Sequence, residues 1–288
     1  MSNLIVDTRV LSRKVTIIAE AGINHNGDKY QAMDMVVEAK KAGADAIKFQ
    51  LFTERARPRG KKFILSEAKW KEVMDVAISE KIECFWSVFD FESVAMAKRL
   101  GAKWVKLAFV ERRNLELIQK CDAAGFERKF VSVDLQGQYP KCFGWEYLYC
   151  PNNGWSGYYP TNLDQIEWEE YSYFAGKNSM GYSCHSEDFY PCIVAASLGA
   201  SVIEKHFKIN NSCPDSDCSL NPAEFKTMVS LIEKILIPMM TIQPQLQKNE
   251  FRVSFHDAVH FGESPFLGGV AETQPGTSKI VEADRNGT

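Results

Sequence analysis

The chain has 288 residues, of which 45% are hydrophobic and 25% charged, and its formal net charge is −3. This composition excludes extensive disorder, and the mixed charge argues against nucleic acid as a main partner, because nucleic-acid-binding proteins carry a basic surface. No apolar run reaches the roughly 18 residues that a membrane span needs, and the opening MSNLIVDTRVLSRK is too charged for a signal peptide, so we expect a cytoplasmic protein without a membrane partner.

Short β-branched segments alternate with amphipathic segments along the chain, beginning with a predicted strand at residues 15–20. After the polar turn NHNGD, apolar residues recur at helical spacing up to Lys41, and Gly43 follows as a helix-end signal. Further strands are predicted at 44–51, 83–87, 104–108, 130–134, 147–150, 179–183 and 202–207. Further helices are predicted at 67–80, 92–100, 115–124, 163–174, 189–198 and 222–235.

Eight strands with helices between them favour an α/β fold of the (β/α)8 TIM barrel type. No GxGxxG motif follows the first strand, which disfavours an open doubly wound sheet. The segment 135–145 is short and contains Gly137, Pro140 and Gly144, so we expect the fifth helix to be shortened to a loop. Periodicity fades beyond Pro244, and we therefore expect a barrel domain over 1–244 and a partly disordered C-terminal tail over 245–288.

Polar residues end most of the predicted strands, where a barrel of this type places its active site. They are Glu20, Lys48, Gln50, Ser87, Lys106, Ser132, Asn152, Asn153, Ser183, His185, Lys205 and His206. One mouth of the barrel would then collect three lysines, two histidines and a carboxylate. Because a barrel needs no such lysine cluster for stability, the pattern predicts a receptor for a compact polyanion such as a phosphorylated carboxylate.

His185 and His206 follow successive predicted strands, so their imidazoles can share one divalent metal and leave coordination positions open. Such an ion would polarise a carbonyl oxygen while the lysines hold an anionic partner near its carbon. The eight cysteines lack a CxxC pair, and we expect most of them to be reduced core thiols. A metal role for Cys213 and Cys218 stays open.

The run IIAEAGINHNGDKYQAMDMVVEAKKAGADAIKFQLF resembles the opening signature of the sialic acid synthase family. GYSCHSED, AASLGASVIEKHF and CPDSDCSLNPAEF resemble its last two barrel units, so the resemblance covers about residues 15–235. It implies condensation of phosphoenolpyruvate with the open-chain aldehyde of an amino sugar, such as N-acetylmannosamine, giving a sialic-acid-like 2-keto-3-deoxy (ulosonic) acid and phosphate. It also implies a divalent metal, with manganese expected, and is compatible with a homodimer.

The resemblance implies a role for each matching position. His185 and His206 would bind the metal, and Glu20 would act as general acid or base beside the aldehyde. Gln50 and Asp215 would line the sugar side, with Asp217 a competitor for the role of Asp215. Phosphoenolpyruvate would be held by Lys48, counted with the catalytic residues, and by Ser87, Lys106, Ser132, Asn152 and Ser183.

Cys184 stands where the family has an acidic residue, either as a soft extra ligand or, as we prefer, as a substituted neighbour of the metal site. His25 is expected to matter mainly for the shape of its turn.

Three departures from the family pattern are visible. The Ser-Gly turn after Lys106 is replaced by FVERR, in which Arg112 and Arg113 either supply donors instead or face solvent. Asp134 replaces part of a Thr-Gly turn and would repel phosphate unless it binds metal or sugar. The family's C-terminal antifreeze-like domain is expected to be absent, which leaves sugar recognition to loops such as 54–62 or 152–162, or to another protein.

Two other functions compete with a phosphoenolpyruvate-dependent synthase. The altered turns also suit a catalytically degenerate barrel that binds a sugar or phosphate ligand as a regulatory or partner subunit. The paired histidines also suit a metal-dependent isomerase or hydrolase, for which zinc would be expected in place of manganese.

Overall fold

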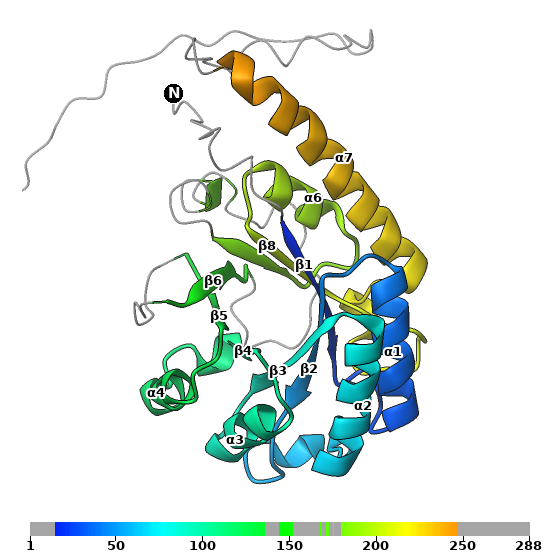
Figure 1. Ribbon diagram of the computed structural model, residues 1–288, viewed down its shortest axis with the longest axis vertical. Helices are drawn as coiled ribbons and strands as arrows, with labels where there is room; N and C mark the ends of the chain where they lie inside the picture. The colour runs from blue at the N-terminus through cyan, green and yellow to red at the C-terminus, as the bar shows by residue number, and fades with distance from the viewer. Residues whose placement is uncertain are drawn as a thin grey trace, which may run out of the picture. The chain divides into compact units, whose positions relative to one another are not determined.

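The computed structural model describes residues 15–135, 144–151, 168, 171–172, 175 and 180–246. The chain divides into two compact units, Met1–Phe251 and Arg252–Thr288, and every described residue belongs to the first. In that unit eight parallel strands form one closed barrel, in which each strand pairs with the next and β8 pairs with β1 (Figure 1). The predicted (β/α)8 fold is therefore confirmed.

The strands are β1 (Thr16–Gly22), β2 (Ala46–Leu51), β3 (Glu83–Val88), β4 (Trp104–Leu107), β5 (Arg128–Val133), β6 (Glu146–Tyr149), β7 (Gly181–Cys184) and β8 (Val202–His206). The α-helices are α1 (Lys29–Lys41), α2 (Glu67–Glu80), α3 (Phe91–Arg99), α4 (Leu115–Ala123), α6 (Tyr190–Ser197) and α7 (Pro222–Leu246). Short 3-10 helices are η1 (Pro58–Phe63), η2 (Phe109–Glu111) and η4 (Ser216–Cys218).

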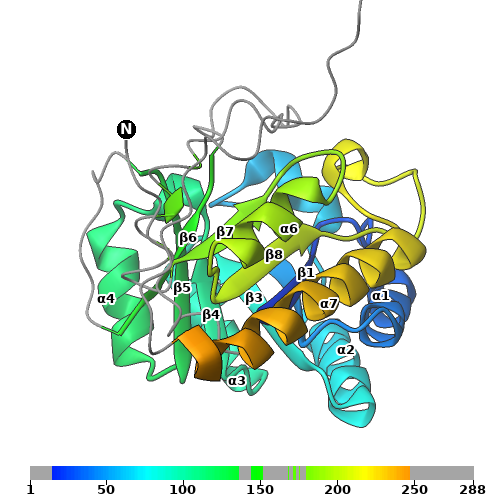
Figure 2. The same cartoon turned by 90° about the horizontal axis from the view of Figure 1, so that it is seen from above.

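The helices lie around the outside of the barrel, where α1 packs on α2 and α6 packs on α7 (Figure 2). Four of them begin at side-chain caps, because Asp28, Ser66, Asp90 and Asn114 each accept a hydrogen bond from a backbone N–H of the first turn. α7 extends beyond the predicted end at 235 and continues to Leu246.

Some predicted segments lie outside the described residues. Of the helix predicted over 163–174 the structure describes Trp168, Tyr171 and Ser172, all helical, and Ala175 just beyond it is helical too. The structure does not describe most of the segment expected to replace the fifth helix or most of the expected tail. The domain boundary at residue 244 stays a prediction. Among the described residues no helix is both long enough and apolar enough to cross a membrane.

The floor of the barrel is tightly packed. Alternate strand residues point inward, and one inward layer is an apolar cluster of Ile18, Ala46, Phe85, Phe130, Leu148 and Val202. At the N-terminal end of the strands, Arg128 donates to both carboxylate oxygens of Glu146 at 2.7 Å and stacks on Trp104. This end is therefore filled, and polar residues two positions further along the strands can face only the opposite mouth.

His25 has a structural role in the turn after β1. It is fully buried, its ring meets Phe49 and Trp70 edge-on, and its Nδ1 accepts a hydrogen bond from the Gly27 N–H at 3.1 Å. Burial lowers the pKa of His25 to about 4. The neutral imidazole of His25 therefore holds the loop in place.

Lowering the pH is expected to destabilise the protein through His25. In the unfolded chain the imidazole of His25 titrates near pH 6.5, and in the folded chain it titrates near 4. Between these pH values the unfolded chain binds more protons than the folded chain, so the free energy of unfolding falls as the pH is lowered. Complete titration of His25 lowers it by about 3 kcal/mol. We expect the free energy of unfolding in urea to fall less between pH 7 and 4.5 in His25→Gln than in the parent protein. Equal pH slopes for the two proteins would show that His25 does not titrate this way.

Candidate active site

A polar layer lies directly above the apolar floor. Its members are inward-facing strand residues, each at most 4% exposed: Glu20, Lys48, Ser87, Lys106, Ser132, Ser183 and Glu204. The strand register brings them together, because Glu20 lies opposite Lys48 and Ser87 lies opposite Lys106. Five of the residues predicted to bind phosphoenolpyruvate therefore share one buried layer with Glu20. They are Lys48, Ser87, Lys106, Ser132 and Ser183.

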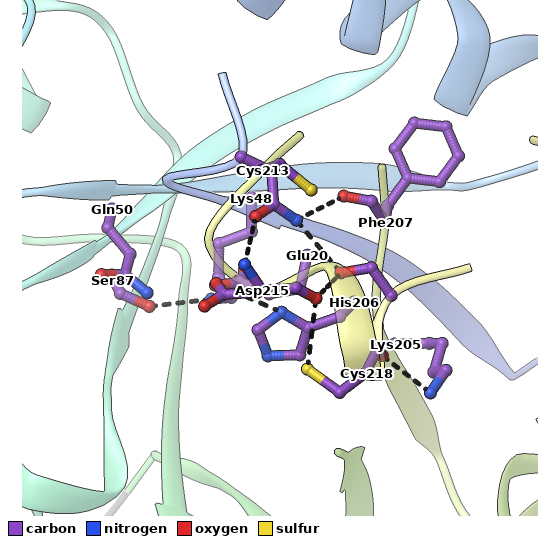
Figure 3. A network of polar contacts seen from close by, with 12 residues as sticks. Glu20, Lys48, Gln50, Ser87, Lys205, His206, Phe207, Cys213, Asp215 and Cys218 are labelled. Atoms are coloured by element: carbon purple, nitrogen blue, oxygen red, sulfur yellow. Dashed lines mark hydrogen bonds and ion pairs between the residues drawn. The ribbon is translucent and has the colours of Figure 1, made fainter. Parts of the chain in front are cut away.

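Two lysines and two glutamates of this layer form one ionic network, of which Figure 3 labels Glu20 and Lys48. Lys48 pairs with Glu20 and donates to Ser87 Oγ at 2.8 Å, and its Nζ lies 3.7 Å from Glu204 Oε2. Lys106 Nζ lies 2.5 Å from Glu204 Oε1, which also accepts from Ser183 Oγ at 2.8 Å. With all four groups ionised, the network carries no net charge.

The sequence-based expectation of three lysines and one carboxylate at the mouth is wrong in two places. Lys205 is buried on the other side of β8, where it donates to the carbonyl oxygens of Ser186 and Cys218 and extends away from the network (Figure 3). Glu204, not predicted, takes part instead. The alternation of side chains along a strand explains both differences, because Glu204 and His206 lie on the inner face of β8 and Lys205 lies on the outer face. That same alternation was the signal by which Glu204 could have been found.

The two network carboxyls differ in acidity. Burial raises the pKa of Glu20 above its ordinary value, in spite of the opposing charge of Lys48. Burial acts in the same direction on Glu204, but the charges of Lys106 and Lys48, with hydrogen bonds from Lys106 and Ser183, outweigh it and hold the pKa of Glu204 at about 2. Neighbouring carboxyls with separated pKa values can take different roles. Glu20 suits a proton donor, and Glu204 suits a fixed counter-ion.

The paired histidines lie beside this network. His206 ends β8 and His185 follows β7, and their ring centroids are 5.0 Å apart. Loss of water around the rings lowers the pKa of His185 to about 4 and that of His206 well below its ordinary value. His206 Nδ1 lies 3.7 Å from Asp215 Oδ2, and His185 Nδ1 lies 3.8 Å from Cys150 Sγ. Both imidazoles are therefore neutral near pH 7, the form that binds metals.

The histidine pair fits a divalent metal. No group of three or more His, Cys, Asp or Glu side chains suited to one ion occurs in the described part of the chain, so these two imidazoles would be its main protein ligands. The other coordination positions would go to substrate and water. Imidazole donors suit zinc, copper, iron and nickel, and oxygen ligands from substrate and water at the other positions suit manganese.

The cysteines near these histidines have other contacts. Cys184 faces the outer core of the barrel, where it contacts Cys192, because it lies between the inward positions of β7. This placement disfavours Cys184 as a direct metal ligand, and its role as a substituted neighbour of the metal site stays a prediction. Cys213 and Cys218 direct their sulfurs to the carbonyls of Asn210 and Asp215 and hold the loop after β8.

The side chains of Glu20, Gln50 and Asp215 converge on Gly22. Gly22 has a φ of +52°, and a Cβ placed there would lie 3.2 Å from Glu20 Oε1, 3.3 Å from Asp215 Oδ2 and 3.5 Å from Gln50 Nε2. Asp215 is buried in a loop that Asn24 anchors by accepting from its backbone N–H at 3.0 Å, whereas Asp217 is exposed. The two residues expected on the sugar side thus meet beside Glu20.

Two further predicted features remain. Asn152 and the loop 152–162 lie outside the described residues. Arg112 is largely buried and pairs with Asp134, whereas Arg113 is exposed, so the two arginines considered together in the sequence have different environments.

Comparison with known proteins gives consistent matches. The sequence model described as "NeuB family" matches residues 35–131 and 156–241. The chain is 29% identical over 256 residues to an N,N'-diacetyllegionaminic acid synthase of Legionella pneumophila, covering 75% of this chain and 70% of that protein. It is also 29% identical over 258 residues to a pseudaminic acid synthase of Campylobacter jejuni, covering 77% of this chain and 74% of that protein.

The fold is also found among solved structures. The N-acetylneuraminic acid (sialic acid) synthetase of Leptospira borgpetersenii, solved in complex with citrate, superposes with a TM-score of 0.70 at 24% identity. The match covers 82% of this chain and 92% of the other. At this identity the likeness supports the barrel architecture alone.

Proposed function

Since the chain belongs to the NeuB family, we propose that it condenses phosphoenolpyruvate with a sugar aldehyde to give an ulosonic acid and phosphate. Membership of the family confirms the resemblance found in the sequence, and the chain, like its named relatives, is a synthase. The observation that best supports the reaction is the junction of the buried lysine–glutamate network with two neutral imidazoles at one barrel mouth.

The network is suited to an anion when Glu20 holds a proton. With Glu20 neutral, Lys48 is released from its ion pair, and the four-residue network carries one positive charge. Lys48 and Lys106 then bind the carboxylate and phosphate of phosphoenolpyruvate, with hydroxyl donors from Ser87 and Ser132. Ser183 joins them when its O–H turns from Glu204 to the ligand. The raised pKa of Glu20 favours this protonation state.

The same proton serves the chemistry. C3 of phosphoenolpyruvate forms a bond to the aldehyde carbon, and the aldehyde oxygen takes the proton held by Glu20. Water adds at C2 and returns one proton to Glu20. The bond between C2 and the phosphate-bearing oxygen then breaks, the second proton of the water leaves with inorganic phosphate, and C2 becomes a ketone. Glu204 remains ionised throughout and holds Lys106 in place.

His185 and His206 would hold the divalent ion, for which we propose manganese, and the ion would supply Lewis-acid polarisation of the aldehyde oxygen. The neutral state of both rings keeps their lone pairs available near pH 7.

The acceptor that we propose is an open-chain amino sugar of the N-acetylmannosamine type, used by a cytoplasmic homodimer. Its hydroxyl groups would meet Gln50 and Asp215 beside Gly22. Arg57, from the loop 54–62, donates to Gln50 Oε1 at 2.7 Å, which supports a part for this loop in binding the acceptor.

The function is tested by incubating the protein with manganese, phosphoenolpyruvate and a panel of hexosamines, 6-deoxy sugars and pentoses. Phosphate release that depends on one acceptor class is expected. Binding of phosphoenolpyruvate without release in any mixture would contradict the synthase and favour a degenerate binding subunit.

Gly22→Ala is expected to weaken acceptor binding. The new methyl group would crowd the side chains of Glu20, Gln50 and Asp215, and the positive φ would add backbone strain. We expect the KM for the acceptor to rise by roughly tenfold or more, with less change in the dissociation constant of phosphoenolpyruvate measured by calorimetry. An unchanged acceptor KM would place the sugar elsewhere.

A further inference from the structure

Arg112 and Asp134 form an ion pair at the mouth of the barrel. Arg112 follows η2, directly beyond β4, and Asp134 follows β5. Their Nη2 and Oδ2 atoms are 3.3 Å apart, and the side chains are only 18% and 13% exposed. Arg112 also donates from Nη1 to the Phe109 carbonyl at 3.0 Å and stacks on the Phe109 ring. The guanidinium is thus held in a fixed place.

This ion pair leaves hydrogen-bonding capacity unused. Arg112 Nε and Asp134 Oδ1 are both fully buried, and neither makes a hydrogen bond within the described residues. The contrast is Arg128 on the barrel floor, which engages both oxygens of Glu146 at 2.7 Å. An arginine fork that meets a carboxylate through one long contact can accept a better-fitting anion.

The position of the pair points toward the anion-binding layer. Asp134 lies two residues beyond Ser132, so it continues the inward face of β5. Lys106 lies on the inward face of the adjacent strand β4, and η2 packs on β5. An anion held by Lys106 and Ser132 would therefore have Arg112 and Asp134 as its neighbours on the outer side.

We propose that Arg112 is a phosphate-binding residue and that Asp134 occupies its guanidinium until the anion displaces it. The inference rests on the proposed function in one respect, namely that the ligand of this mouth is phosphoenolpyruvate. A phosphate group can accept paired hydrogen bonds from the planar guanidinium of arginine. Asp134 makes only a single contact with Arg112. The carboxylate of Asp134 repels the same phosphate, so the pair lowers anion affinity when the ligand is absent.

The two residues are therefore expected to act in opposite directions. Arg112→Met should weaken binding of phosphoenolpyruvate and of inorganic phosphate by roughly tenfold or more, because charge-assisted hydrogen bonds are lost. Asp134→Asn should tighten the binding of both anions by severalfold, since it removes the carboxylate charge that competes for Arg112 and keeps the size of the side chain. Arg113→Met is the matched control, because it removes the same charge from the exposed neighbouring position, and it should leave both affinities nearly unchanged.

The test is isothermal titration calorimetry of the parent protein and the three variants with each of the two anions. Thermal unfolding of every variant accompanies it, and a gain of affinity in Asp134→Asn cannot come from misfolding. The inference is overturned if both Arg112→Met and Asp134→Asn weaken binding, or if neither changes it, because the pair would then be a structural brace. Since the readout is binding, it stays informative if no acceptor supports turnover, a result that would overturn the proposed synthase alone.

Discussion

Replacing His185 or His206 with alanine is expected to lower the rate of product formation by roughly a thousandfold or more. The reason is that metal polarisation of a carbonyl stabilises the transition state by several kcal/mol. Each change removes one of two imidazoles whose centroids lie 5.0 Å apart. The described part of the chain has no third ligand grouped with them. Manganese affinity, followed by electron paramagnetic resonance of the free ion, should fall together with activity.

His25→Gln provides the matched control for these two variants. His25 is also a buried histidine with a lowered pKa, but it packs on Phe49 and Trp70 instead of facing the mouth. It should lose stability while retaining manganese binding. Full manganese affinity in both His185→Ala and His206→Ala would remove the histidine pair from the metal site.

Glu204→Gln is expected to have the second largest effect, on both stability and the pH profile. Glu204 is the partner of Lys106 and lies 3.7 Å from Lys48, so its loss leaves a buried positive charge without compensation. Removing one partner of such a pair costs about 3–5 kcal/mol. The free energy of unfolding from urea titration should fall by an amount in this range.

The pH profile distinguishes a role in the reaction from a role in stability alone. The charge of Glu204 raises the pKa of Glu20, so the neutral amide should lower it. Because Glu20 must be protonated to donate, the alkaline limb of kcat should move to lower pH in Glu204→Gln. Glu146→Gln, which breaks the ion pair with Arg128 on the floor, should reduce stability without moving that limb. An unmoved limb in Glu204→Gln would exclude Glu20 as the proton donor.

Sequence periodicity was sufficient to predict the barrel. Apolar residues with a period near two marked the strands, those with a period near 3.6 marked the helices, and the closed order β1 to β8 follows from eight such units. The positions of Lys48, Ser87, Lys106, Ser132 and Ser183 in one layer follow from the same logic, because each lies at an inward position of its strand.

The errors within the site have one physical source. Selecting polar residues at strand ends without assigning each to a face admitted Lys205 and missed Glu204, although a single step along β8 reverses the direction of a side chain. The pairing of Arg112 with Asp134 could not be predicted, because it joins segments after two different strands. The pKa difference between Glu20 and Glu204 likewise depends on which lysine approaches each carboxyl in three dimensions.

The most direct test of the central claim is mass spectrometry of the product formed from phosphoenolpyruvate, manganese and a mixed pool of sugars. The account predicts a new acid whose mass equals that of one acceptor sugar plus one pyruvate unit, formed with an equal amount of inorganic phosphate. Consumption of phosphoenolpyruvate to free pyruvate without such an adduct, or the absence of any new acid across the pool, would contradict it.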